Sequence, residues 1–486
     1  LACLDSADPE HALAALIEFS ATRPGHFGVW RILAAPDQAP LVRRIADLFG
    51  ASEPLSRGLI GLPGPRGGAS DGGLALLMEA SVGDLPSKDE LQLQWAKDQR
   101  DDGSETELDD RLQLFKHRQL VRIGLTDLGR RPDPLDVGRV LSDLADLILG
   151  EILAQLARSS RIRADQPGFS LAVFALGKFG MQAMDYGSDL DLLFVFEPLE
   201  EGSATQIRED AQKIARQLIS RLEQRIRGVR LYEVDMRLRP SGRQGLLVSS
   251  LEGFRSYHAR ALAVWERLAL VWLRPVAEAI VHGPSTSAST KRGSEISEPG
   301  SAPSLIDRVV GEVVPASLWP SEADPDLMRS TIVADTRRLK RRIEDEIARE
   351  TRDTLDVKTG VGGCLELELL VAALQLSFGG ERPELRSHEL PVALARLASA
   401  GLLDPNEASE LDRAYRFERL LLNRLRMSRG SAWGETDRLT VNSPRLTALA
   451  RRMGLADTDA LVSTLTRHRA IVRAAFDRHL PPADAP

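Results

Sequence analysis

Residues 169–197 read FSLAVFALGKFGMQAMDYGSDLDLLFVFE. The apolar run 169–176 predicts a buried strand, and the run 190–196 predicts a second strand after a glycine-containing connection. Asp189 and Asp191 open this second run. Because successive strand side chains point to opposite faces, the two carboxylates emerge on one side, roughly 7 Å apart. Carboxylates held that close repel each other unless a cation lies between them, so the pair predicts a divalent metal site.

A third carboxylate follows in the segment VRLYEVDMRLRP, residues 229–240. Val234 and Met236 alternate there with Asp235, which predicts a strand with one apolar and one charged face. Between the strands, apolar residues recur at helical spacing over 204–227. A strand, a helix and a strand in succession return Asp235 to the side of the Asp pair.

Two arginines, Arg237 and Arg239, lie on the same predicted strand face as Asp235. An Asp-x-Asp motif by itself is more often a turn or a helix cap, and an Asp-Met-Arg-Leu-Arg strand by itself fits an exposed amphipathic edge. Aspartate is depleted in strand interiors, however, and three of them stand here at strand positions with apolar neighbours. The combination predicts a site for Mg²⁺ and a polyphosphate.

Two blocks carry a resemblance to a known family: GKFG…YGSDLDLLF (177–194) and VDMRLRPSGRQGLLVSS (234–250). They resemble the glutamine synthetase adenylyltransferase family, whose catalytic modules belong to the nucleotidyltransferase superfamily that also holds DNA polymerase β. Similar stretches such as FKHRQLVRIGLTDLG (115–129), DVKTGVGG (356–363) and AYRFERLLLNRLR (414–426) extend the resemblance over nearly the whole chain. It implies an α+β fold: a polymerase-β-like nucleotidyltransferase domain, with a small mixed sheet and helices, flanked by N-terminal helices and a C-terminal helical bundle.

The resemblance also implies a reaction. AMP would pass from ATP to a tyrosine of glutamine synthetase, with release of pyrophosphate, in the regulation of nitrogen metabolism. Two Mg²⁺ ions would assist, with Asp189 and Asp191 binding both ions and Asp235 completing the ion nearer the nucleophile. A free phenol has a pKa near 10, so the tyrosine needs activation at neutral pH.

Six residues would bind ATP: Gly177, Lys178, Gly187, Ser188, Arg237 and Arg239. The first glycine lets backbone amides approach phosphate closely, the lysine supplies a point charge, and the arginines would clamp phosphate oxygens bidentately. Met181 and Ala183 depart from the family pattern in the intervening loop. Glu366 and Glu368 take the positions of a family acid pair, but they fit a helix N-terminal pair equally well.

Three other functions remain open. The first is the module that removes AMP by phosphorolysis in the same bifunctional family. The second is a regulatory module without catalysis, which would bind the PII signal protein or glutamine; PII is an expected regulator in any case. The third, a tRNA or poly(A) nucleotidyltransferase, is disfavoured because the net charge is −7 and no basic aromatic stripe occurs.

The composition indicates the class of protein and its cellular compartment. A hydrophobic content of 43% supports full cores, and the two cysteines, Cys3 and Cys364, predict no disulfide framework and a reducing, cytoplasmic compartment. No apolar run approaches the roughly 18 residues of a membrane span. Because the chain starts at Leu1 and family members carry two homologous modules, we expect it to be one module of a longer protein, most like the C-terminal, attaching module.

The pattern divides the chain into four regions: an N-terminal helical region (1–158), the catalytic domain (159–282), a flexible Ser/Gly/Pro linker (283–304) and a C-terminal helical bundle (305–486). The polar segment 85–107 is expected to be mobile, and 254–272 is expected to form one helix.

Overall fold

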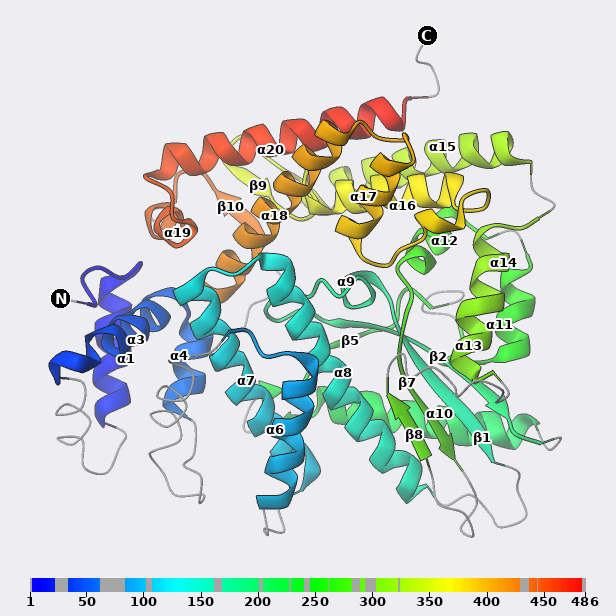
Figure 1. Cartoon of the computed structure of the whole chain (residues 1–486), viewed down its shortest axis with the longest axis horizontal. Helices are drawn as coiled ribbons and strands as arrows, with labels where there is room; N and C mark the ends of the chain where they lie inside the picture. The colour runs from blue at the N-terminus through cyan, green and yellow to red at the C-terminus, as the bar shows by residue number, and fades with distance from the viewer. Residues whose placement is uncertain are drawn as a thin grey trace.

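The computed structural model describes residues 2–21, 34–61, 84–101, 107–160, 168–200, 204–226, 229–239, 245–260, 262–281, 289–292, 303–321, 324–428, 437–443 and 445–482. Its central sheet contains β1 (Phe169–Ala175), β2 (Leu190–Pro198), β5 (Val234–Asp235), β6 (Val248–Ser250), β7 (Arg274–Val281) and β8 (Ser289–Arg292). The strands lie in the order β5-β2-β1-β7-β8, and β6 also pairs with β2 (Figure 1).

The sheet is mixed in direction. β1 runs antiparallel to both β2 and β7, whereas β5 and β6 run parallel to β2. β5 pairs with the first residues of β2, and β6 pairs with β2 farther along, at Phe194. Two small ladders lie outside this sheet: β3 (Arg225–Ile226) with β4 (Val229–Arg230), and β9 (Thr354–Asp356) with β10 (Arg438–Thr440).

The two faces of the sheet pack into two separate hydrophobic clusters. On β2, Phe194 belongs to the cluster that contains the N-terminal helices, whereas Leu193 and Val195 belong to the cluster of the C-terminal helices. Because strand side chains alternate between faces, Asp191 shares its face with Leu193 and Val195. The face that carries the predicted acidic site is therefore the face covered by the C-terminal helices.

The helices before the sheet are α1 (Pro9–Ala21), η1 (Pro36–Gln38), α3 (Ala39–Ala51), α4 (Glu53–Ile60), α6 (Lys88–Asp101), α7 (Leu108–Arg130) and α8 (Pro134–Ser159). Among them, α8 packs directly against β7 of the sheet, whereas α1, α3 and α4 pack on one another and α3 and α4 also contact α7. The helix after β2, α10 (Ala204–Glu223), packs on α8. α8 begins at a strong start signal, because the Asp133 carboxylate accepts a hydrogen bond from Leu135 N at 2.9 Å and Pro134 occupies the first turn. It is buried along most of its length.

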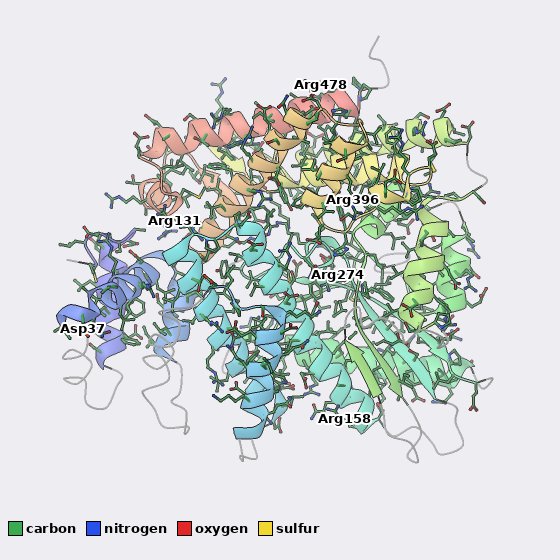
Figure 2. The ribbon with its side chains drawn as sticks, viewed as in Figure 1. Asp37, Arg131, Arg158, Arg274, Arg396 and Arg478 are labelled. Carbon is green, nitrogen blue, oxygen red and sulfur yellow. The ribbon has the colours of Figure 1, made fainter. Side chains whose placement is uncertain are left out.

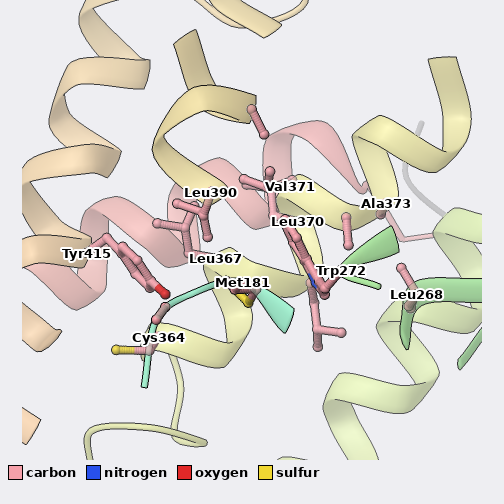
Figure 3. Close-up of a cluster of buried hydrophobic side chains, with 14 of the residues drawn as sticks. Met181, Leu268, Trp272, Cys364, Leu367, Leu370, Val371, Ala373, Leu390 and Tyr415 are labelled. Carbon is pink, nitrogen blue, oxygen red and sulfur yellow. The ribbon is translucent and has the colours of Figure 1, made fainter. Parts of the chain in front are cut away.

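The rest of the chain is mostly helical: α9 (Gly177–Gly180), α11 (Leu251–His258), α12 (Val264–Val271), α13 (Leu305–Arg308), η3 (Val309–Val313), α14 (Val314–Leu318), α15 (Pro325–Ile343), η4 (Glu344–Ala348), α16 (Cys364–Phe378), η5 (Pro383–Leu385), α17 (Leu390–Ser399), α18 (Pro405–Ser428), α19 (Arg445–Met453) and α20 (Thr458–His479). Figure 3 shows Met181, just after α9, and Trp272, just after α12, in one cluster with Leu370 of α16. The C-terminal helices thus share a core with the sheet domain.

Buried ion pairs join the parts of the molecule. Arg274 of β7 lies near the middle of the molecule (Figure 2) and donates to both carboxylate oxygens of Asp146 on α8, at 2.7 and 2.9 Å. Arg424 of α18 makes the same two-pronged contact with Asp127 of α7, at 2.7 Å for each bond. Such fork-to-fork pairs fix orientation as well as distance.

The structure corrects several local predictions. Part of the segment expected to be mobile forms α6, because Leu91 and Trp95 are buried in the first cluster. The helix expected over 254–272 is divided into α11 and α12. Within the predicted linker, 289–292 forms β8 against β7, and Ser304 caps α13; residues 283–288 and 293–302 lie outside the described residues.

The four-region division of the chain stays a prediction. In the part of the chain that the structure describes, no helix is both long enough and apolar enough to pass through a membrane.

Candidate active site

The three predicted aspartates lie together at one edge of the sheet. Asp191 and Asp235 are direct partners across the parallel β2–β5 ladder, and Leu190 N donates to Glu233 O at 2.9 Å beside them. Partners in a ladder point to the same face, and Asp189 stands two residues before Asp191 on that face. Strand–helix–strand order therefore returns the third acid to the pair, as the sequence predicts.

The negative charges of Asp189 and Asp235 repel the charge of Asp191. Burial raises the pKa of Asp191 to about 7, with further upward contributions from the charges of Asp189 and Asp235. Lys358 and Arg237 act in the opposite direction without cancelling the rise. A carboxyl group in this setting favours its neutral form until a cation arrives.

Asp235 already has a cationic partner, Arg237. The guanidinium contacts Asp235 Oδ2, with Nε at 2.6 Å, and the Arg237 backbone N–H donates to Oδ1 at 2.8 Å. Among the described residues, no group of three or more His, Cys, Asp or Glu side chains converges as a finished metal centre would. The trio is adjacent at the sheet edge, and the carboxylate of one member, Asp235, is paired with Arg237.

Gly177 lies directly against Asp191. Its φ is +53°, and a Cβ at this position would lie 2.5 Å from Asp191 Oδ2. The backbone conformation and the lack of space both require glycine here. Leu176 N donates to Asp191 O at 3.0 Å, so the start of α9 is fixed to the strand that carries the acids.

The other predicted phosphate donors are occupied within the protein. Ser188 N donates to Asp185 O at 3.1 Å, and Asp185 N donates back to Ser188 Oγ at 3.0 Å, closing a turn in which Gly187 has φ +67°. Lys178 Nζ donates to Asp185 Oδ2 at 2.7 Å, and the lysine side chain is only 11% exposed. The structure thus places Lys178 and Ser188 in a supporting layer beneath the acids.

Helix α18 reaches this turn from the far end of the chain. Arg419 lies 2.8 Å from Asp185 Oδ1, and Arg426 Nη1 lies 3.3 Å from both Asp185 Oδ2 and Ser188 Oγ. Arg426 also holds both oxygens of Asp437, at 2.7 and 2.8 Å. The turn before Asp189 is therefore positioned by two arginines for which the sequence alone predicts no role.

The remaining predicted residues divide between the site and the core. Arg239 lines the same cavity as Asp235, and its guanidinium donates to Met236 O at 3.0 Å. Glu366 is fully buried, accepts from Gly362 N at 2.9 Å and pairs with Lys340 at 3.0 Å. Glu368 accepts from the Tyr415 hydroxyl at 3.0 Å. Glu366 thus holds the start of α16, which favours the helix N-terminal interpretation for this acid, whereas Glu368 links α16 to α18.

A cavity of about 450 Å³ opens beside the acids. Its lining mixes charges of both signs with two apolar side chains: Asp189, Glu223, Arg230, Glu233, Val234, Asp235, Met236, Arg237 and Arg239. Asp191 and Gly177 do not line it. The acidic group therefore has two sides, one facing this cavity and one facing Gly177.

Two parts of the sequence match family models, and most of the sequence is similar to named proteins. Residues 75–287 match the family model described as glutamate-ammonia ligase adenylyltransferase, and residues 337–480 match the one described as GlnD PII-uridylyltransferase. A protein of Cutibacterium acnes is 30% identical over 75% of this chain and 34% of its own length. One of Xanthobacter autotrophicus is 30% identical over 78% of this chain and 37% of its own.

Both relatives carry the name bifunctional glutamine synthetase adenylyltransferase/adenylyl-removing enzyme. The chain spans about a third of their length. The family-model match covers β1, β2, β5 and the three aspartates. Residues 75–287 are thus similar to the glutamate-ammonia ligase adenylyltransferase family.

Proposed function

We propose that this chain transfers AMP from ATP to a tyrosine of glutamine synthetase. One observation carries the proposal: Asp191 and Asp235 are direct partners on parallel strands, with Asp189 two residues before Asp191. Desolvation of Asp191, together with the charges of the other two acids, raises the pKa of Asp191 to about 7. Carboxylates gathered this closely disfavour one another's charged forms, and groups perturbed in this way occur most often at functional sites.

The donor set fits Mg²⁺, an ion that prefers carboxylate oxygens. Asp189, Asp191 and Asp235 would hold it once Arg237 releases Asp235. The Arg237 side chain is 64% exposed, so water can solvate its guanidinium once it leaves the Asp235 carboxylate. When bound, Mg²⁺ supplies positive charge to the reacting phosphate oxygens and to the attacking oxygen.

Side chains around the acids would place the two reactants. ATP would lie on the Gly177 side, where the glycine lets the backbone approach Asp191 closely. The tyrosine would enter the cavity lined by Asp189 and Asp235. The phenol oxygen bonds to the α-phosphorus, the bond from that phosphorus to the β-phosphate bridging oxygen breaks, pyrophosphate leaves, and the phenol proton passes to a base or to water.

The match of residues 337–480 supports a catalytic role for the C-terminal helices as well. The two family descriptions name the transfer of different nucleotides, adenylyl and uridylyl groups. A shared helical region would serve what these reactions have in common, the handling of a nucleoside triphosphate. PII as a regulatory partner, and a cytoplasmic location, belong to the same proposal.

Removal of AMP is the second candidate, because the relatives' printed name includes both activities. In that reaction inorganic phosphate, rather than the phenol, attacks the α-phosphorus, and ADP is the product. The same acids would serve, so the product formed distinguishes the two directions.

The test is incubation of the full chain with glutamine synthetase, Mg²⁺ and ATP labelled at the α-phosphate. We expect label on glutamine synthetase with wild type and a loss of at least roughly 1,000-fold with Asp191→Asn, because the metal charge is worth several kcal/mol. Asp345→Asn, at an exposed carboxylate, is the matched control and should transfer normally.

Transfer that persists in Asp191→Asn would reject the proposed site. Release of ADP from adenylylated glutamine synthetase in phosphate, without any attachment from ATP, would replace the proposal with the removing activity.

A further inference from the structure

Among the described residues, the side chain of Lys358 near the acids makes no hydrogen bond or ion pair. Lys178 is bound by Asp185, and Arg426 by Asp437 and Asp185. By contrast, the Lys358 ammonium makes no hydrogen bond or ion pair with any described residue. It is close enough to lower the pKa values of both Asp191 and Lys178. A cation left free in such a charged neighbourhood is available to a ligand.

The backbone that carries Lys358 is rigid. Asp356 Oδ1 accepts from Lys358 N at 3.0 Å and from Thr359 N at 2.7 Å. From below, buried Lys340 donates to the carbonyls of Thr359 and Gly360, at 3.0 and 2.8 Å. The amides of this turn are thus used internally, so it offers a ligand its lysine ammonium rather than an amide nest.

The turn is also joined to the loop that carries the acids. Val357 N donates to Asp437 O at 3.0 Å, and the Asp437 carboxylate holds Arg426. Arg426 in turn reaches Ser188 Oγ at 3.3 Å, one residue before Asp189. This relay fixes the Lys358 turn against the face of the sheet that carries the acids, the face covered by the C-terminal helices.

We propose that Lys358 binds the β- and γ-phosphates of the nucleoside triphosphate, so that the C-terminal helical region completes the nucleotide site. The proposal rests on the proposed function and reassigns to Lys358 the role that the sequence suggests for Lys178. Phosphates placed beside Gly177 and Asp191 lie on the face that this turn covers, whereas the acceptor cavity lies on the Asp235 side.

The test compares ATP with AMP, which lacks the β- and γ-phosphates. Equilibrium dialysis of the full chain in Mg²⁺, without glutamine synthetase, gives the Kd of each labelled nucleotide. We expect Lys358→Met to weaken ATP binding roughly 10- to 100-fold, the usual value of a charge-assisted contact, and to change AMP binding less than about twofold.

Two further variants control for folding and for net charge. Lys358→Arg keeps the charge and should bind ATP within a few-fold of wild type. Lys213→Met removes the same charge from the exposed face of α10 and should bind both nucleotides normally. If Lys358→Met does not fold, Lys358→Arg tests the proposal alone. A normal ATP Kd for this variant that rises with salt more than its AMP Kd does supports the proposal.

Equal weakening of ATP and AMP, or an unchanged Kd for ATP, in folded Lys358→Met would overturn the assignment of Lys358 alone. So would an ATP Kd for Lys358→Arg that responds to salt no more than the AMP Kd does. A wild-type chain that binds no ATP would overturn the proposed function and this inference together.

Discussion

Asp185 and Asp191 are six residues apart, and their environments act in opposite directions. Asp185 is surrounded by Arg419, Lys178 and Arg426, which hold the pKa of its carboxyl well below its usual range despite complete burial. For Asp191, burial comes with two more acids, and its pKa rises to about 7. Within one short stretch of chain, Asp185 is thus paired with cations, whereas Asp191 on β2 faces two other acids.

The pKa values of Asp185 and Asp191 differ because cationic side chains from a distant part of the chain contact Asp185. Arg419 and Arg426 reach Asp185 from α18, more than 230 residues later in the chain. The same cluster lowers the pKa of Lys178, because burial and the charge of Arg419 outweigh the pairing with Asp185. A buried acid with three cations is structural, whereas a buried acid facing other acids requires a cation from solution.

The largest effect should follow from neutralising Asp185, the acid that is paired with cations. Asp185→Asn removes the carboxylate that pairs with buried Arg419 and Lys178, while Arg426 keeps its pairing with Asp437, which should lower the free energy of unfolding by about 3–5 kcal/mol. Urea unfolding followed by circular dichroism measures the loss. The exposed Asp345→Asn serves as control and should change stability by less than about 0.5 kcal/mol. A mild effect at Asp185 would mean that the cations are solvated by water instead.

Asp191, which faces two other acids, should lower the stability of the folded protein when it is ionised. Without metal, Asp191 keeps a proton in the folded state between about pH 4 and 7 while the unfolded chain has lost it. Folded protein then binds more protons than unfolded protein, so its stability falls as pH rises through this window and levels off above about 7.

Asp191→Asn removes that titration. In EDTA, we expect the variant to be more stable than wild type by roughly 2–4 kcal/mol at pH 8, and by little at pH 4. Thermal melts across this pH range measure the difference. An advantage for the variant that is independent of pH would show that folding does not shift the pKa of Asp191.

The smallest effect concerns Arg237, whose exposed guanidinium holds Asp235. Arg237→Ala should change the free energy of unfolding by less than about 1 kcal/mol. Because it removes a competitor for the carboxylate, it should tighten Mn²⁺ binding about two- to fivefold, as measured by calorimetry. Arg352→Ala, at an exposed arginine, is the control. Weaker Mn²⁺ binding would indicate that Arg237 instead orients Asp235 for the metal.

Much of the site is predictable from local sequence. Asp189 and Asp191 open an apolar run, and the helical pattern after it predicts α10 and the return of Asp235. Period-two alternation puts the acids on one face of the strand. Gly177, the first residue of α9, allows the close approach of the Asp191 carboxylate. Edge strand β8 was missed because its Ser-Thr-Lys-Arg sequence has no strand pattern and depends on pairing with β7.

Strand and helix periodicities act over short distances along the chain, so the placement of three carboxylates at one edge of a small sheet could be predicted from local sequence. Which cation pairs with which acid follows from the fold. Lys178, adjacent to the loop, is drawn to Asp185, and Lys358, far along the chain, stays unpaired near Asp191. Ion pairing depends on distance in space and on burial, and neither is written in the spacing of residues.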